Sequence, residues 1–281
     1  MSAPTPTTPA PVHGAVRDAS DHYHRHGWCP APFAFGEEAV TALRSRVIAL
    51  GRQDRPEVVT ESDSGTARAV HGCHTWDELC AALVRLPELV GLAEAILGRE
   101  VYVYQFKVNF KPPREGAAWP WHQDYAFWSE EDGMPAPDAV NIAVALDDAH
   151  RGNGPLTLLP GTHRLGLLDL PERAARSGHW RDHVSADLAY TVTPERAARL
   201  SAEHGTRTLV GPAGSVHAFH PSLVHSSTDN LSDDRRALLL ITYNAVDNAP
   251  PAPTRPPFLV ARDTAAVRPL PDPRLTPRTL A

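Results

Sequence analysis

The stretch from Val101 to Phe110 alternates between two kinds of side chain, and this alternation restricts the possible fold more than any other feature of the sequence. Successive side chains of a β-strand point to opposite faces, so a period of two predicts a strand. The polar face of this strand either lines a wet cavity, as in the wall of a barrel, or faces solvent. The apolar face would carry Tyr102, Tyr104, Phe106, Val108 and Phe110, and the polar face Gln105, Lys107 and Asn109.

A second strand is predicted from Asp138 to Asp147, with bulky side chains on one face and small ones on the other. The small face either leaves room for a ligand or allows two sheets to pack closely. Further short runs, separated by glycine and proline, have the spacing typical of a jelly roll. We therefore expect a mainly β protein with flanking helices, whose core is a double-stranded β-helix, that is, a jelly roll of the cupin type. The further runs are 155–159, 206–210, 215–219 and 236–243.

Helices are predicted before these strands, between residues 36 and 98. In residues 37–50 the apolar side chains recur at helical spacing, after two acidic residues and before a glycine. Thr75 and Glu78 form a capping box that predicts a second helix, and Pro87 stands where a third helix would begin. We expect these helices to pack on one sheet of the jelly roll.

The length of 281 residues allows a full hydrophobic core, and we expect a single jelly-roll domain over residues 15–263 with its core strands in 101–245. Residues 1–14 and 264–281 are rich in proline and are expected to lack regular structure. Residues 165–203 form an insertion of mixed polarity. It is expected to carry one or two helices and to cover the mouth of the barrel.

The net charge of −6 provides no cationic surface for nucleic acid or anionic lipid. The three cysteines have no zinc-like spacing and cannot all pair, which favours a reducing compartment. No apolar run approaches the length of a membrane span. We therefore expect a soluble cytoplasmic protein that acts on a small molecule, without nucleic-acid or membrane partners, and a homodimer is considered as its assembly.

Residues 119–128 place a histidine and a carboxylate two positions apart within a run of aromatic residues. In an extended strand His122 and Asp124 would point to the same side and converge on one point. They would supply two of the three ligands of the facial triad that binds non-haem Fe(II). The triplet alone is weak evidence in a chain with 15 histidines and 33 acidic residues, since a hydrogen-bonded pair on a strand would look the same.

His225 is the preferred third ligand because of the sequence that follows it. It ends a short apolar run, a turn-rich segment comes next, and Arg236 then opens another strand-like run. A hairpin of this kind would bring its two strands side by side and place Arg236 about the length of one small cosubstrate molecule from the metal. The planar guanidinium of an arginine can bind a carboxylate through two hydrogen bonds. A metal triad with such an arginine is what a 2-oxoglutarate-dependent oxygenase requires.

Six motifs follow one another in the sequence. They are Gln105-x-x-x-Asn109, Trp121-His-x-Asp124, Trp128-x-x-Glu-Asp-Gly-Met-Pro135, Asn153-Gly-Pro-Leu-x-Leu-Leu-Pro-Gly-Thr-His163, Gly211-Pro-Ala-Gly-Ser215, and His225 with Arg236. In this combination the chain resembles the phytanoyl-CoA dioxygenase family, and within it the ectoine hydroxylases and their relatives. The resemblance covers roughly half the chain. His217 and His220 remain alternative ligands, but neither is followed by an arginine at the interval found in the family.

The resemblance and the motifs together imply a hydroxylase that uses Fe(II), 2-oxoglutarate and O2 and releases succinate and CO2. Fe(II) would be held by His122, Asp124 and His225. The 2-oxoglutarate would be held by Arg236, Ser227, Asn109 and Trp119. The substrate would be framed by Gln105, Trp128, Ala139, Asn141, Phe219 and Leu240, although any one of the aromatic residues is as readily a core residue. The segment from Arg255 to Arg262 resembles one that closes ectoine hydroxylases near the active site.

Asp124 favours hydroxylation over halogenation, because related halogenases have a small residue at that position. Relative to ectoine hydroxylases we expect a serine in place of Asn141 and an aromatic residue in place of Leu240. A free amino acid, a cyclic imino acid or a small natural-product scaffold is therefore the expected substrate, with ectoine as one candidate. Two alternatives remain. A divalent-metal cupin-like hydrolase or isomerase would use the same ligands without Arg236, and a non-catalytic binding protein would need neither.

Overall fold

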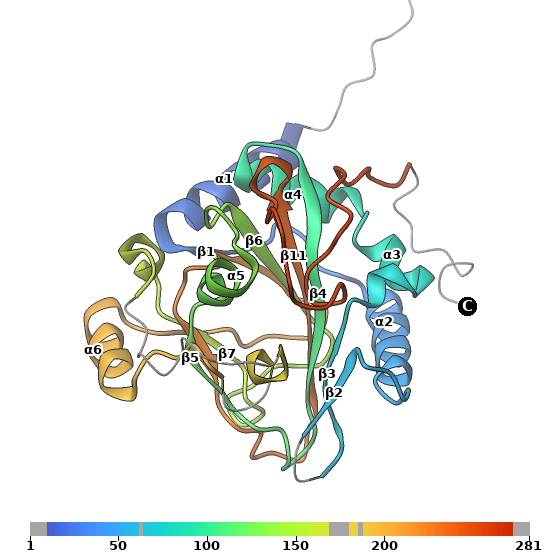
Figure 1. Ribbon diagram of the computed structural model, residues 1–281, viewed down its shortest axis with the longest axis vertical. Coiled ribbons are helices and arrows are strands. Elements are labelled where there is room, and N and C mark those ends of the chain that lie inside the picture. Colours follow the sequence, from blue (N-terminus) through green and yellow to red (C-terminus); the bar gives the residue numbers. More distant parts are fainter. Residues whose placement is uncertain (1–9, 62–63, 169–179, 185–187, 272–281) are drawn as a thin grey trace, which may run out of the picture.

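The computed structural model describes residues 10–61, 64–168, 180–184 and 188–271. Within these residues the strands form a seven-stranded sheet, ordered β1-β9-β6-β11-β4-β3-β2, and a four-stranded sheet, ordered β5-β10-β7-β8, with antiparallel pairing (Figure 1). The expected double-stranded β-helix is confirmed. The strands are β1 (Trp28–Pro30), β2 (Val58–Thr60), β3 (Ala67–His71), β4 (Val101–Lys111), β5 (Trp119–His122), β6 (Ala139–Ala145), β7 (Leu156–Leu158), β8 (Arg207–Thr208), β9 (Val216–Phe219), β10 (His225–Ser227) and β11 (Arg236–Ala245).

Four amino-terminal helices cover the outer face of the larger sheet (Figure 1). Their apolar side chains and the outward side chains of β4, β6 and β11 form one continuous buried cluster. The opposite face of this sheet looks toward the smaller sheet, and the functional cavity lies between the two. The helices are α1 (Ala10–His26), α2 (Glu37–Leu50), α3 (Glu78–Leu83), α4 (Pro87–Leu97), α5 (Asp124–Asp132) and α6 (Pro194–His204).

The second predicted helix, α3, forms with a different cap from the one expected. The side chain of Asp77 accepts a hydrogen bond from the Cys80 backbone N–H at 3.0 Å, which satisfies a free donor in the first turn. Thr75 belongs to the preceding 3-10 turn and does not cap α3. The predicted helices α2 and α4 form as expected; α4 begins at Pro87 and is capped after Leu97 by Gly98 in the left-handed conformation.

Helix α1 overlaps residues 10–14, the last part of the segment 1–14 that was expected to lack regular structure. The helix begins at Ala10, and residues 1–9 lie outside the described part of the chain. Tyr23 is 1% exposed, and the Ser20 hydroxyl donates to the carbonyl of Ala95 in α4 at 3.1 Å. The helix is therefore held by packing on the rest of the fold, which the local proline content does not reveal.

The carboxyl-terminal tail has no helix or strand from residue 249 to residue 271, but it is attached to the fold. The backbone N–H of Val267 donates to the carbonyl of Val101, and that of Leu270 donates to the carbonyl of Arg85, both at 2.8 Å. Residues 272–281 lie outside the described chain. Among the described helices, none has both the length and the apolar character that crossing a bilayer requires.

A β-bulge in β4 changes the predicted alternation. Thr242 of β11 pairs with Gln105, and the next residue, Tyr243, pairs with Val103, so Tyr104 has no partner in this ladder. Because of this extra residue, the side chains that precede it lie on the opposite face of the sheet from the one that strict alternation predicts. Tyr102 and Tyr104 were expected to share a face with Phe106, but they pack on the cavity side with Trp128, whereas Phe106 and Val108 lie in the outer cluster. Gln105, Lys107 and Asn109 face the cavity as predicted.

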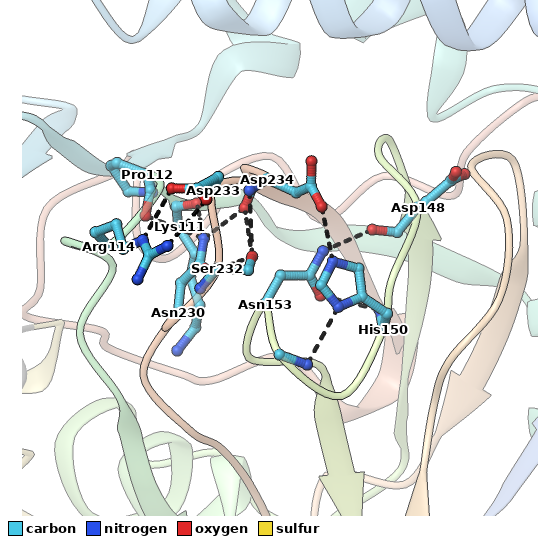
Figure 2. A network of polar contacts seen from close by, with 11 residues as sticks. Lys111, Pro112, Arg114, Asp148, His150, Asn153, Asn230, Ser232, Asp233 and Asp234 are labelled. Atoms are coloured by element: carbon cyan, nitrogen blue, oxygen red, sulfur yellow. Dashed lines mark hydrogen bonds and ion pairs between the residues drawn. The ribbon is translucent and has the colours of Figure 1, made fainter.

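The strands β10 and β11 were expected to form a hairpin, but they lie in different sheets: β10 pairs with β5 and β7, and β11 pairs with β4 and β6. The connection between them is fixed by the side chain of Asn230, which is 0% exposed. Its amide donates to the carbonyls of Lys111, Pro112 and Asp234 at 3.0, 3.1 and 2.7 Å. Its oxygen accepts from the backbone N–H and the hydroxyl of Ser232 at 3.0 and 2.9 Å. Figure 2 shows Asn230 at one side of a wider network that includes the contact between His150 and Asp234. The loop that leads into Arg236 is therefore held in one conformation.

Replacing Asn230 with alanine is expected to lower the free energy of unfolding by about 2–4 kcal/mol, because several buried backbone groups lose their partner at once. Urea denaturation followed by circular dichroism measures this change. Asp233→Ala is the matched control, since this neighbouring side chain is exposed and forms an ion pair with the exposed Arg114. Equal stability of Asn230→Ala and Asp233→Ala would contradict the structural role of Asn230.

Candidate metal centre and ligand cavity

His122, Asp124 and His225 come together at the inner face of the smaller sheet. His122 ends β5 and His225 begins β10, and the two residues are direct partners in the antiparallel ladder. One ligand atom from each of the three residues lies within 4.8 Å of the others. The carboxylate oxygens of Asp124 lie 3.8 Å from Nε2 of His122 and 3.7 Å from Nε2 of His225. The described residues contain no other group of three such ligands.

The histidine and the carboxylate were expected on one strand, but the strand ends between them. β5 stops at His122, and Asp124 is the first residue of α5. They still converge because the intervening Gln123 keeps an extended backbone, with φ −118° and ψ 125°. The Gln123 side chain points away from the metal ligands and donates to the carbonyls of Gly166 and Ser222 at 2.8 and 2.7 Å. This buried amide therefore fixes the junction between β5 and α5, so that the His122 and Asp124 side chains point to the same place.

Both imidazoles are oriented by backbone carbonyls. Nδ1 of His122 lies 2.6 Å from the carbonyl of Pro120, and Nδ1 of His225 lies 2.9 Å from that of Leu223. A carbonyl only accepts, so each Nδ1 carries the proton and each Nε2 offers a lone pair to the centre. Burial lowers the pKa of His122 to about 3, and burial also lowers the pKa of His225. Both rings are therefore neutral at physiological pH, the state that binds a metal ion.

Asp124 is held as an anion by its surroundings. Burial alone would raise its pKa, but Lys107 and the two imidazoles outweigh this effect and lower the pKa to about 2. Nζ of Lys107 lies 3.4 Å from one carboxylate oxygen. The Asn141 amide donates to the other oxygen at 2.8 Å, and the oxygen of the same amide accepts from the Thr242 hydroxyl at 2.6 Å. Neutral nitrogen and ionised oxygen ligands of this kind fit Fe(II).

Asn141 was expected to contact substrate, but it does not line the cavity. It is 0% exposed, and both ends of its amide are used by Asp124 and Thr242. Ala139 does not line the cavity either, because it packs in the aromatic cluster around Tyr104. The other four expected substrate residues do line the cavity, and they are Gln105, Trp128, Phe219 and Leu240.

Removing the amide of Asn141 is expected to weaken metal binding. Groups that hold a metal ligand in place typically contribute 10- to 100-fold to affinity, so Asn141→Ala should raise the dissociation constant for Fe(II) by about that factor. Anaerobic titration with Fe(II) measures it, and thermal unfolding of the metal-free variant separates this effect from a loss of fold. An unchanged dissociation constant would show that Asp124 does not depend on Asn141.

The expected cosubstrate residues line the other end of the cavity. Arg236 is 3% exposed and donates from Nε to the carbonyl of Gly154 at 3.1 Å. Burial lowers its pKa only to about 10, so it stays charged. None of the described carboxylates forms an ion pair with it. Nε1 of Trp119 and Oδ1 of Asn109 are buried and lack hydrogen-bond partners in the described structure, and Ser227 also lines this end.

A buried cation and unpartnered polar atoms are what a cavity built for a dicarboxylate would contain. The residues present therefore fit 2-oxoglutarate, just as the triad fits Fe(II). Arg236 opens β11 and Leu240 lies four residues further along the strand, and both line the same cavity as the metal ligands.

Sequence reasoning missed several residues of the cavity wall. Val184 and Leu188 come from the insertion over residues 165–203, and they place part of it at the cavity, whereas 169–179 and 185–187 lie outside the described residues. The Arg255–Arg262 segment closes the cavity as the resemblance implied, because the Gln105 amide donates to the carbonyl of Leu259 at 2.7 Å. Lys107, His71 and Phe127 also line it. The polar face of β4 was the signal that could have identified Lys107.

The two alternative histidine ligands lie elsewhere. His217 is on β9 beside Trp28, with 6.3 Å between the ring centroids. His220 accepts a hydrogen bond at Nδ1 from the backbone of Ser222 at 3.0 Å. A jelly roll with two histidines, one carboxylate and a buried arginine along the same cavity defines the class of non-haem iron, 2-oxoglutarate-dependent oxygenases.

Comparison with known proteins gives the family. Residues 23–238 match the model of the phytanoyl-CoA dioxygenase family. The chain is 55% identical over 266 residues to an L-proline trans-4-hydroxylase of Streptomyces griseoviridis, covering 94% of this chain and 99% of that protein. It is 35% identical over 275 residues to an ectoine dioxygenase of Bordetella parapertussis, covering 93% and 87%. This chain belongs to the phytanoyl-CoA dioxygenase family.

The fold agrees with solved structures of the family. The structure of EctD from S. alaskensis with 2-oxoglutarate and 5-hydroxyectoine is similar to it, with a TM-score of 0.76 and 30% sequence identity. The match covers 89% of this chain and 86% of that one. A second structure of the same protein, with bound Fe, has a TM-score of 0.75.

Proposed function

We propose that this protein is an Fe(II)- and 2-oxoglutarate-dependent hydroxylase of a free cyclic imino acid, with L-proline as the first candidate substrate. His122, Asp124 and His225 would hold the iron, and Arg236 with Ser227, Asn109 and Trp119 would hold 2-oxoglutarate. When bound, iron and 2-oxoglutarate supply the chemistry that replaces a C–H hydrogen by hydroxyl and releases succinate and CO2. The observation that carries the proposal is the triad at one end of a buried cavity whose other end holds Arg236, for which the described residues offer no carboxylate partner.

The protein's own part in this reaction is to bind, orient and exclude water. The neutral imidazoles and the ionised Asp124 are already in the protonation states that a metal needs. Three large aromatic side chains, Phe127, Trp128 and Phe219, line the cavity together with the metal ligands. Such a wall keeps bulk water from the reacting carbon and suits a small ring.

The substrate class is supported by the cavity and by the relatives together. The protein with 55% identity is named as an L-proline trans-4-hydroxylase, and that with 35% identity as an ectoine dioxygenase. L-Proline and ectoine, the compounds in these two names, are both small cyclic molecules. Leu240 lines the cavity at the place where ectoine hydroxylases are expected to have an aromatic residue, which favours L-proline over ectoine.

Incubation with Fe(II), 2-oxoglutarate and O2 tests the proposal. L-Proline is expected to give succinate in equal amount to a product that has gained one oxygen, and chromatography against authentic isomers of hydroxyproline identifies the position. Ectoine is the comparison substrate. Turnover of ectoine in preference to L-proline would replace the substrate and keep the reaction class.

The two alternative functions predict different results from the same experiment. A divalent-metal hydrolase or isomerase would change its substrate without consuming 2-oxoglutarate, and a binding protein would change neither molecule. Absence of 2-oxoglutarate consumption with every substrate tested would overturn the proposed reaction.

The cytoplasm is the proposed location, supported by three buried free cysteines, Cys29, Cys73 and Cys80. A homodimer is the proposed assembly, which light scattering after size-exclusion chromatography tests.

A further inference from the structure

Lys107 places an ammonium group next to the metal ligands. It lies on β4 directly opposite Leu240 of β11 and His71 of β3, and it lines the cavity. Its side chain is 17% exposed, and its charge has one partner among the described residues, Asp124 at 3.4 Å. This partner is a proposed metal ligand, so its negative charge is shared with a divalent ion when iron is bound. Lys107 is then a partly buried cation without an anion of its own.

The other two cations of the cavity are already committed. Arg255 donates from Nε to Asp132 at 2.8 Å and forms a second contact with the same carboxylate through Nη2. This buried pair leaves no net charge there. Arg236 is assigned to the distal carboxylate of 2-oxoglutarate. Among the cations of the described cavity wall, Lys107 is therefore the one without an assigned anionic partner.

The position of Lys107 on its strand separates it from the cosubstrate end. Arg236 and Leu240 are four residues apart on β11, and Leu240 is the partner of Lys107. At about 3.3 Å per residue, this places Lys107 roughly 13 Å along the sheet from Arg236. Nζ of Lys107 lies 3.4 Å from Asp124, whereas the guanidinium of Arg236 contacts the carbonyl of Gly154, so the two cations serve different ends of the cavity. On the other side of Lys107, Gln105 is held by the tail at Leu259, so a ligand of Lys107 lies between the metal and the closing segment.

We infer that Lys107 binds the carboxylate of the amino-acid substrate, which rests on the proposed function. A charge-assisted hydrogen bond from the ammonium to this carboxylate compensates the buried cation and fixes one end of the substrate beside the metal. A fixed carboxylate sets which carbon of a small ring faces the metal, so Lys107 positions the reacting C–H bond. The buried Nε2 of His71 lacks a partner among the described residues, and the same ligand would supply one.

The test uses Lys107→Met and two probes that differ in one group, L-proline and L-prolinamide. Each probe is titrated anaerobically into enzyme loaded with Fe(II) and 2-oxoglutarate. The complex of Fe(II) with chelated 2-oxoglutarate is expected to have a visible charge-transfer band, and binding of a probe is followed by the change in this band. The wild type is expected to bind L-proline at least 10-fold more tightly than L-prolinamide. Lys107→Met is expected to raise the dissociation constant of L-proline by about 10- to 100-fold. The dissociation constant of L-prolinamide should stay within about 3-fold of the wild-type value, so that the preference for L-proline disappears.

Two further variants separate this role from a structural one. Lys107→Arg keeps the charge and is expected to retain most of the preference for L-proline. Arg99→Met removes an exposed cation of the same sheet region, paired with Asp138 and Asp247, and is expected to match the wild type. The dissociation constant for 2-oxoglutarate should stay within about 3-fold in all variants.

Three results would overturn the inference. Lys107→Met could keep the full preference for L-proline, in which case another cation such as Arg255 holds the carboxylate. Lys107→Met could lose the charge-transfer band, in which case Lys107 serves the metal site. Both Lys107→Met and Lys107→Gln could fail to fold, in which case Lys107 serves the fold. Failure of the proposed function is a different result, because the wild type itself would then form no band and release no succinate.

Discussion

Asp124→Ala is expected to abolish coupled turnover and to weaken Fe(II) binding by at least about 100-fold. Loss of a group that merely orients a ligand already costs 10- to 100-fold, and here a ligand itself is removed. The variant also leaves two neutral imidazoles without the carboxylate that faces both of them. Anaerobic Fe(II) titration measures the affinity, and succinate release measures turnover.

Asp247→Ala is the matched control for this variant. Its carboxylate is on the surface, with a side chain 70% exposed, and it pairs with Arg99. It is expected to bind Fe(II) as the wild type does. Wild-type turnover by Asp124→Ala would remove Asp124 from the metal site and with it the assignment of the triad.

Arg236→Met is expected to raise the KM for 2-oxoglutarate by about 100-fold or more. The variant removes a charge-assisted contact and would leave the distal carboxylate of the cosubstrate buried without a partner, which costs several kcal/mol. The dissociation constant for Fe(II) should change little, because Arg236 contacts none of the three ligands. Initial rates at increasing concentrations of 2-oxoglutarate, with iron saturating, measure the effect.

The neighbouring Arg235 offers a close control. Arg235 is half exposed and pairs with Asp147 at 3.1 Å on the outside of the fold. Arg235→Met should therefore keep the wild-type KM for 2-oxoglutarate. If both variants raised this KM equally, a general effect of lost charge would explain the result, and Arg236 would have no specific role.

The metal ligands and Arg236 could be predicted from local sequence motifs. Two ligands lie two residues apart around an extended Gln123, and the third, on β10, is followed by the connection that leads to Arg236 on β11. The reason given for Arg236 was wrong, since no hairpin forms between β10 and β11; Arg236 lines the cavity because β10 and β11 belong to the two sheets that face each other across it. The long alternating runs likewise predicted β4 and β6, because burial of one face is a property of the strand itself.

The parts that could not be predicted depend on contacts between distant segments. Asn141 has no local feature that separates a substrate contact from a hydrogen bond to Asp124, and only the packing of β6 against α5 decides between them. The extra residue at Tyr104 becomes visible only when β4 is paired with β11. Helix α1 is stabilised by α4 and β1, and the proline-rich residues before it gave the opposite indication. Val184 and Leu188 reach the cavity by folding of an insertion without a clear period.

A crystal structure of the protein loaded anaerobically with Fe(II) and 2-oxoglutarate tests the central claim most directly. The structure is expected to show one iron bound by Nε2 of His122, Nε2 of His225 and a carboxylate oxygen of Asp124, with the distal carboxylate of 2-oxoglutarate on the guanidinium of Arg236. Iron bound at other residues, or a cosubstrate whose distal carboxylate lies away from Arg236, would contradict it.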